Sequence, residues 1–493
     1  MIERLWLRVL IYTLGLIRWA AAREARAYSL LSLGALQPLH ESIVRLRARE
    51  VFLKARAECP AYSAFLVEQG YRDSRRWADL PVTNKENYVK RWSIEQRCYG
   101  GRLKGKGEMI DESSGSSGLP NNWVRSAAER KDVKRLLQLN YDLMYGDRPR
   151  ILLNCFALGP WATGMNVSMS LVDVGVLKSL GPDAQKLENT LKTFGTGYEY
   201  LVFGYPPFVK TFVDGTTLDL KSYTLDLVVG GEGISELLRG YLRRHFRTVF
   251  SSYGASDLEI NIGIETEWTV ALRAQCAADP TLAQALFGRE AAPMIFQFNP
   301  LDYLIETLPS GEMAYTVCRM DGAAPKIRYN LKDEGGAILF RDVARTLADR
   351  GIDARRLAPR FGRFPILYVF GRSDLTVAFY GAKLCPADVE ATVLGSPALA
   401  SSVRSFQMWS PEDERANKTL CIALELGPSV SAQPLESAQL KELFYRGLAA
   451  SNQDFREVSK MFPSSALEVV CHACGTGPFE DADIRVKSRY VRS

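Results

Sequence analysis

A run of small residues is the first segment that could bind a ligand: Ser113, Ser114, Gly115, Ser116, Ser117 and Gly118, followed by Leu119 and Pro120. Such a run cannot build a core. Its backbone N–H groups and hydroxyls can wrap a polyphosphate, because glycine allows close approach and unusual dihedral angles. It is not a Walker loop, since no Gly-Lys-Ser/Thr follows it. Taken alone, it fits a flexible linker equally well.

A second candidate, Ser251-Ser252-Tyr253-Gly254-Ala255-Ser256-Asp257, directly follows the strand-like Thr248–Phe250. Ligands of α/β sheets bind where strands end. The Ser256 hydroxyl and the Asp257 carboxylate could hold a phosphate and Mg²⁺ there, and the Tyr253 ring could stack on a base. Taken alone, the same segment is also typical of an ordinary turn.

Two further segments place a carboxylate in a turn. One is Lys326–Asp333 and the other is Gly371-Arg372-Ser373-Asp374. A carboxylate can accept two hydrogen bonds from the hydroxyls of a ribose, which suits nucleotide binding. Singly, each segment also fits a surface turn.

The elements that must position these residues alternate between strand and helix. Strand-like apolar runs occur at 151–158, 200–205, 225–231 and 248–254, and helical patterns occur at 127–144, 183–195 and 235–246. This alternation predicts an α/β domain with a largely parallel sheet. Residues 271–292 predict helix, and residues 293–340 predict β structure with turns.

The two ends of the chain differ from this centre. Residues 1–100 read mostly as helix, with Thr83 or Asn84 as a helix N-cap. The uncharged run Val9–Ile17 is too short to span a bilayer, so we expect an amphipathic N-terminal helix that packs on the body or touches a membrane surface. A short α+β pattern begins near residue 371. We predict a helical region at 1–100, an ATP- and acid-binding core at 101–370 and a small C-terminal lid domain at 371–493.

Composition excludes several classes of protein. The 493 residues are too many for one ordinary core. The net charge of +6 is small and the basic residues are spread along the chain, so we expect no nucleic-acid partner. Nine cysteines, an odd number in mostly apolar surroundings, favour reduced thiols and a cytoplasmic location. Only three histidines occur and none lies in a motif, which argues against histidine acid–base chemistry.

Taken in order, these segments resemble the adenylate-forming superfamily of acyl-CoA synthetases, adenylation domains and luciferases. The resemblance covers nearly the whole chain and is greatest to the phenylacetate-CoA ligase-like branch, which includes capsule-cluster homologues. SSGSSGLP resembles its phosphate loop, SSYGASD its Tyr-Gly-x-Ser/Thr-Glu motif, KIRYNLKD its Arg-Tyr-x-x-Gly-Asp segment and GRSDLTVAFYGAKL its hinge. It implies a large N-terminal α/β domain with mostly parallel sheets and a small mobile α+β C-terminal domain.

The resemblance also implies a role for each candidate residue. Ser113 to Gly118 would cradle the phosphates of ATP, and Asp257 would help hold Mg²⁺. Tyr253, beside Gly254, would stack on adenine, and Gly231 and Glu232 would line the nucleotide and acid pocket. Ser256 would contact the α-phosphate, Asp333 would bind the ribose hydroxyls, and Arg372 would bind the ribose or a phosphate. Asp374 would be the hinge of the small domain, and Gly381 would lie where the CoA thiol enters.

The sequence departs from this family at several positions. The usual Pro-Lys-Thr-x-x-Gly-Lys pattern is absent, and Lys487 is the lysine of the C-terminal tail, so we predict it as the catalytic lysine. Asp257 replaces the usual Glu, Leu119 stands where relatives often carry Lys, and Lys332 replaces the Gly before Asp333. These changes keep ATP binding and put CoA as acceptor in question.

We therefore expect an ATP-dependent ligase that makes an acyl-adenylate from a small acid and passes the acyl group to CoA. An amine, a hydroxyl or a protein thiol as acceptor, and a non-catalytic nucleotide-binding homologue, are the alternatives. Aromatic and small residues suit a flat or aryl acid; they are Phe156, Gly159, Trp161, Phe203, Tyr205, Gly230 and Gly231. A homodimer and a weak membrane contact of the N-terminal helix are further partners that the sequence leaves open.

Overall fold

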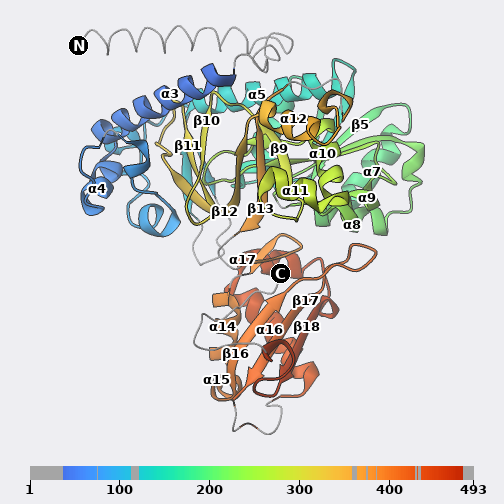
Figure 1. Cartoon of the computed structure of the whole chain (residues 1–493). Coiled ribbons are helices and arrows are strands. Elements are labelled where there is room, and N and C mark those ends of the chain that lie inside the picture. The colour runs from blue at the N-terminus through green and yellow to red at the C-terminus, as the bar shows by residue number, and fades with distance from the viewer. Residues whose placement is uncertain are drawn as a thin grey trace, which may run out of the picture. The chain divides into compact units, whose positions relative to one another are not determined.

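The computed structural model of the 493-residue chain describes residues 37–74, 76–112, 121–231, 233–357, 363–372, 376–384, 386–427, 430 and 435–480. It divides into a large unit, built from most of residues 1–371, and a C-terminal unit built mainly from residues 372–493. The large unit is α/β with one long sheet, and the C-terminal unit is a smaller α+β structure (Figure 1). The predicted amphipathic N-terminal helix, which includes Val9–Ile17, lies outside the described residues.

The sheet of the large unit has eleven strands in the order β10-β11-β12-β13-β9-β8-β7-β6-β5-β3-β4. Its parallel half consists of β4 (Val176–Ser179), β3 (Arg150–Asn154), β5 (Glu199–Gly204), β6 (Thr224–Val229) and β7 (Thr248–Tyr253). Strands β3 and β5 to β7 are apolar and buried because helices cover both faces. These are the four strands that the sequence predicted.

Helices connect and cover the parallel strands. They are α5 (Ala127–Tyr145), α6 (Ala162–Leu171), α7 (Ala184–Phe194), α8 (Pro206–Gly215) and α9 (Glu236–Leu242). Helix α5 begins with a capping box in which Ser126 and Glu129 each accept the other's backbone N–H. The three predicted helices are confirmed, although α9 ends at Leu242 rather than Phe246.

The other half of the sheet is antiparallel. It contains β8 (Gly263–Ile264), β9 (Met294–Phe298), β10 (Tyr303–Thr307), β11 (Glu312–Val317), β12 (Tyr329–Ile338) and β13 (Ile366–Arg372). Helix α3 (Gln37–Glu58) lies along β10 (Figure 1), and its residues Val44 and Ala48 pack on Leu304. Helix α4 (Pro60–Glu68) and a short helix at Lys85–Val89 complete this side, and Asn84 is the N-cap of the latter.

The helical prediction for residues 271–292 is only partly right. Two helices occur, α10 (Glu267–Ala278) and α11 (Pro280–Phe287). Pro280 ends the first because it has no N–H to donate, and it is favourable in the first turn of the second. Asp279 caps α11 by accepting from the backbone N–H groups of Thr281 and Leu282. Helices α12 (Phe340–Ala348) and α13 (Ala354–Leu357) follow later in the chain.

The C-terminal unit has its own sheet and core. Strands β16 (Val403–Trp409), β17 (Leu420–Leu426) and β18 (Leu467–His472) form the sheet, and β14 (Val377–Phe379) and β15 (Ala382–Leu384) form a hairpin. Its helices are α14 (Pro386–Leu394), α15 (Pro397–Ser402), α16 (Ser437–Ser451) and α17 (Gln453–Ser459). Leu440, Phe444 and Leu448 of α16 pack in the buried core.

None of the helices described here is both long and apolar enough to cross a bilayer.

Candidate active site

The chain makes a compact turn where β7 ends at Tyr253. Ile262 donates its N–H to the Tyr253 carbonyl over 2.9 Å, and Ala255 donates to the Glu259 carbonyl over 2.9 Å. A Cβ on Gly254 would lie 2.3 Å from the carbonyl carbon of Ile260, so only glycine fits there. The turn presents Ser256 and Asp257, both half-buried, at the carboxyl end of a parallel strand.

Tyr253 and Asp333, which lie 80 residues apart, meet beside this turn. The Tyr253 hydroxyl donates to Asp333 Oδ2 over 2.5 Å and lies 2.9 Å from the Tyr315 hydroxyl. Burial, and then the nearby Asp333 carboxylate, raise the pKa of Tyr253 well above its ordinary value. Tyr253 therefore stays protonated, and one oxygen of Asp333 already accepts a hydrogen bond.

Asp333 follows a residue with unusual backbone geometry. Lys332 has φ +69°, in the left-handed region that favours glycine. The register of β11 with β12 shifts between Glu312 and Ala314, so β12 carries a bulge at this point. Lys332 Nζ lies 3.4 Å from a Glu312 carboxylate oxygen, an ion pair that a glycine could not form. Asp333 therefore lies within the irregular part of β12.

Asp257 is held from the opposite side of the turn. Tyr329, the first residue of β12, donates its hydroxyl to Asp257 Oδ2 over 2.8 Å. The Tyr329 ring meets the Trp123 ring edge-on, with centroids 5.8 Å apart. Trp123 belongs to β2 (Asn122–Arg125), which pairs with β1 (Met109–Glu112). Glu112 and Asn122 are paired across this hairpin.

Arg125 is a buried site residue that sequence reasoning missed. Its guanidinium donates to the backbone carbonyls of Leu258, over 2.5 Å, and Ser256. It also pairs with Asp111 at 3.0 Å and with Glu129 at 3.2 Å. One side chain therefore ties β1, β2 and α5 to the turn after β7. Its local sequence gave little signal, because Arg125 is the last residue of the four-residue strand Asn122–Arg125.

The ion pairs continue beneath the turn. Lys326 Nζ lies 2.9 Å from Glu129, and Arg319 lies 3.2 Å from Glu259. Burial raises the pKa of Glu129, but Lys326 and Arg125 outweigh it and bring that pKa to about 2. Burial raises the pKa of Glu259, with Arg319 opposing it. A cavity of about 250 Å³, including any part open to solvent, is lined mainly by charged groups of this network and by Ile260.

A larger and mainly apolar cavity also has Ile260 in its lining. It measures about 570 Å³, including space open to solvent, and lies between α5, α6 and one face of the parallel sheet. Its apolar lining includes Leu137, Met144, Phe156, Val167, Leu171, Leu201, Phe203, Val228, Ile260 and Ile264. Phe156 and Phe203 were predicted to line an acid pocket. Gly159, Trp161, Tyr205, Gly230 and Gly231 are not among its lining residues.

Gly230 and Gly231 nevertheless border the Tyr253 turn. A Cβ on Gly230 would lie 2.9 Å from Ser252 Oγ and 3.5 Å from Phe156 Cζ, and both neighbours line the apolar cavity. Gly231 has φ +85° and is exposed. The described part of the large unit thus brings together five predicted site residues: Tyr253, Gly254, Ser256, Asp257 and Asp333. A further predicted residue, Gly231, directly follows Gly230 in the sequence.

The remaining predicted residues are placed elsewhere or not described. Arg372 is the exposed last residue of β13 and is grouped with the C-terminal unit. Gly381 has φ +92° and forms, with Tyr380 at φ +46°, the two-residue turn between β14 and β15. The predictions for Ser113 to Gly118, Glu232, Asp374 and Lys487 lie outside the described residues.

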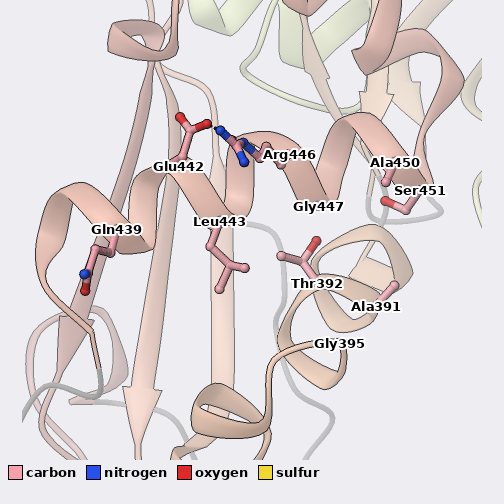
Figure 2. Close-up of a pocket in the computed structure, with 10 residues that line it drawn as sticks. All are labelled: Ala391, Thr392, Gly395, Gln439, Glu442, Leu443, Arg446, Gly447, Ala450 and Ser451. Carbon is pink, nitrogen blue, oxygen red and sulfur yellow. Dashed lines mark hydrogen bonds and ion pairs between the residues drawn. The ribbon is translucent and has the colours of Figure 1, made fainter.

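The C-terminal unit has a wide groove of its own, between α14 and α16 (Figure 2). Figure 2 shows the Glu442–Arg446 ion pair on α16 at its edge, with an N···O distance of 2.5 Å. No predicted site residue lines this groove. The described residues also contain no cluster of three or more His, Cys, Asp or Glu side chains that could hold a metal ion by themselves.

Comparisons with known proteins match the chain at the level of fold. No protein-family model and no curated protein matches it. It is similar to 2-hydroxyisobutyryl-CoA ligase in complex with 2-HIB-AMP and CoA in the thioesterification state, with a TM-score of 0.62 and 15% identity over 92% of this chain and 90% of that chain. An open conformation of that ligase with the same ligands gives a TM-score of 0.52 and 14% identity over 92% and 90%. At such identities the likeness shows a shared fold.

Proposed function

We propose that this chain, which has the fold of the adenylate-forming ligases, activates a small carboxylic acid with ATP. An oxygen of the acid attacks the α-phosphorus, the bond to the β-phosphate oxygen breaks, and acyl-adenylate and pyrophosphate result. CoA then attacks the acyl carbon through its thiol, AMP leaves and a thioester forms.

One observation carries this proposal: the convergence of Tyr253, Asp333 and Asp257 at the end of β7. Asp333 would accept hydrogen bonds from the ribose, and the Tyr253 ring would lie beside adenine. Ser256 would contact the α-phosphate. Arg125, which holds the Ser256 carbonyl, would position this turn without touching the substrate. Ser113 to Gly118 would cradle the β- and γ-phosphates.

The donor set fits Mg²⁺ bound together with ATP. Mg²⁺ is usually held by one or two carboxylates plus substrate phosphates and water, so Asp257 alone would suffice from the protein. When bound, Mg²⁺ neutralises negative charge on the phosphates. Tyr329 occupies only one carboxylate oxygen of Asp257 among the hydrogen bonds described for it, and it orients the group.

Lys487 is our candidate for the cation that stabilises the charge developing at the α-phosphate. Support comes from the chain itself, since Lys487 is the one lysine between residue 481 and the C-terminus. CoA as acceptor is supported by the similarity to a ligase whose structure contains CoA. An amine, hydroxyl or protein-thiol acceptor remains the alternative, because Leu119 and Lys332 depart from the family pattern.

Acid-dependent ATP–pyrophosphate exchange tests adenylation before any acceptor is added. We expect exchange with at least one class of acid. Asp257→Asn and Lys487→Ala should each lower the exchange rate on the order of 100-fold, the usual cost of losing one group that stabilises developing charge. Asp349→Asn is the matched control, because Asp349 is an exposed carboxylate after α12, away from the site.

The acceptor is then read by mass spectrometry after adding CoA or hydroxylamine. Formation of an acyl-CoA supports the full proposal. If only a hydroxamate forms, the adenylation step is supported and CoA is not the acceptor. Protein that binds ATP but shows no exchange with any acid would contradict the proposed activity.

A further inference from the structure

We propose that the apolar cavity between α5, α6 and the parallel sheet selects a carboxylic acid whose tail is an uncharged, mainly apolar alkyl or aryl group with no second ionised group. This inference rests on the proposed function, which supplies the need for an acid. It goes further by naming the chemical class of that acid from the walls of the cavity.

The lining residues give the cavity a direction along the sheet. Ser252 lines it at the end of β7, immediately before Tyr253. Leu201 lines it two residues before Phe203 on β5, which places Leu201 roughly 6 to 7 Å farther from the carboxyl ends of the strands. Met144 and Tyr145, at the end of α5, also line it. An acid with its carboxyl group near Tyr253 would therefore extend its tail toward Met144.

None of the sixteen residues that line the cavity is charged. The polar ones are neutral: Asn140, Thr163, Ser252 and Asn261, together with the two tyrosines Tyr141 and Tyr145. Asn261 Oδ1 is buried without a hydrogen-bond partner, so it could accept one bond from a neutral donor. A charged tail would lose its hydration with no partner of opposite sign on the walls, which is strongly unfavourable.

Nearby charges are separated from the cavity and already paired. The Arg150 guanidinium lies 5.0 Å from the centroid of the Tyr145 ring, does not line the cavity, and pairs with Glu199 at 2.7 Å. Arg125 and Glu129 pair with each other at 3.2 Å in the neighbouring charged cavity. Ile260 lines both cavities.

A set of six-carbon acids isolates the effect of the tail. Hexanoate, adipate, 6-aminohexanoate and gluconate share chain length but differ in charge and polarity, and 3-phenylpropionate adds an aryl tail. In ATP–pyrophosphate exchange we expect hexanoate or 3-phenylpropionate to exceed adipate and 6-aminohexanoate in kcat/KM by on the order of 100-fold or more, because the second charge would be buried unpaired.

A pair of variants on one helix tests whether this cavity is the origin of the preference. Met144→Ala enlarges the far end, so the ratio of kcat/KM for octanoate over hexanoate should rise about tenfold. Leu139→Ala is the control: Leu139 is buried in α5, at 2% exposure, but does not line the cavity. It should leave that ratio unchanged even if it lowers stability.

The outcomes separate the inference from the proposed function. Exchange that is best with adipate, 6-aminohexanoate or gluconate would overturn the inference and keep the function. A change in the octanoate-to-hexanoate ratio that is equal in both variants would also overturn the inference. If no acid supports exchange, calorimetric titration decides between the remaining cases. Binding of hexanoate but not of adipate supports the cavity assignment and contradicts the proposed adenylation. Binding of neither acid overturns both the cavity assignment and the proposed adenylation.

Discussion

Glu129 is a carboxylate that stays ionised in a fully buried position. Lys326 and Arg125 both lie within 3.2 Å of it, and together they hold its pKa near 2 against the opposing effect of burial. A folded-state pKa below the unfolded one means that the ionised form stabilises the fold. That stability is present above the unfolded pKa of about 4.5 and is lost as the pH falls toward 2.

Replacement of this carboxylate should therefore change both stability and its pH dependence. We expect Glu129→Gln to lose on the order of 3 kcal/mol at pH 7, because Lys326 and Arg125 remain buried with less compensation. Between pH 4.5 and about 2 the variant should lose less further stability than the wild type. Urea unfolding at several pH values measures both effects.

Glu442→Gln is the matched control for this prediction. Glu442 pairs with Arg446 on the surface of α16, where both side chains are exposed. Exposed pairs of this kind contribute about 0.5 kcal/mol or less. Equal losses of unfolding free energy in the two variants would mean that burial does not increase the contribution of the Glu129 ion pairs to stability.

Sequence reasoning located the residues that carry motifs and missed the one that connects them. Tyr253, Asp257 and Asp333 were singled out because each lies in a recognisable local pattern. Arg125 carries no such pattern, since its partners Asp111, Leu258 and Ser256 come from distant parts of the chain. Lys332 is a related case, because nothing in its neighbours indicated a positive φ at a non-glycine residue.

Helices α14 and α16 approach each other closely at one glycine. A Cβ on Gly447 would lie 2.5 Å from Thr392 Cγ2 and 2.6 Å from Thr392 Oγ1 (Figure 2). Thr392 is β-branched, and its hydroxyl donates to the Asp388 carbonyl over 3.0 Å, so it cannot easily move away. The packing of these helices depends on the missing side chain.

We expect Gly447→Ala to destabilise the C-terminal unit by about 1 to 2 kcal/mol, since the steric cost outweighs the gain in helix propensity. Gly240→Ala in α9 is the control, because Gly240 has no atom within 4 Å of an added Cβ and should gain up to about 1 kcal/mol. Thermal unfolding measures both. Stabilisation by Gly447→Ala would show that the helices can separate at no cost.

At the scale of elements, hydrophobic periodicity predicted the buried strands and the long helices, and capping and helix-breaking residues decided where they end. The error at 271–292 arose because Pro280 was not given its effect as a helix break. The β1–β2 hairpin was missed because each strand has only four residues. Such short strands are fixed by tertiary contacts such as those of Arg125, rather than by a pattern of their own.

The molecule contains more than one hydrophobic core. Phe65, Tyr88 and Phe296 belong to one in the large unit, and Leu440 and Phe444 belong to a separate one in the C-terminal unit. Units with their own cores can unfold separately. The domain bounds at residues 100 and 370 stay a prediction, for which limited proteolysis is the direct test.

We therefore predict two transitions in scanning calorimetry of the full chain. Gly447→Ala should lower the midpoint of one, and Glu129→Gln should lower the midpoint of the other, because the two residues belong to different units. A single transition that both substitutions shift equally would show that the chain unfolds as one cooperative body.

The position of Ile260 has a consequence for how the acid specificity of this site could evolve. Ile260 lines both an apolar cavity and a charged one, and Gly254 permits its backbone to lie where it does. A single substitution at this position would therefore alter the space in both cavities at once. Arg125 is already paired with Asp111 and Glu129, so a descendant that accepts polar acids would also need a new polar or charged partner for them.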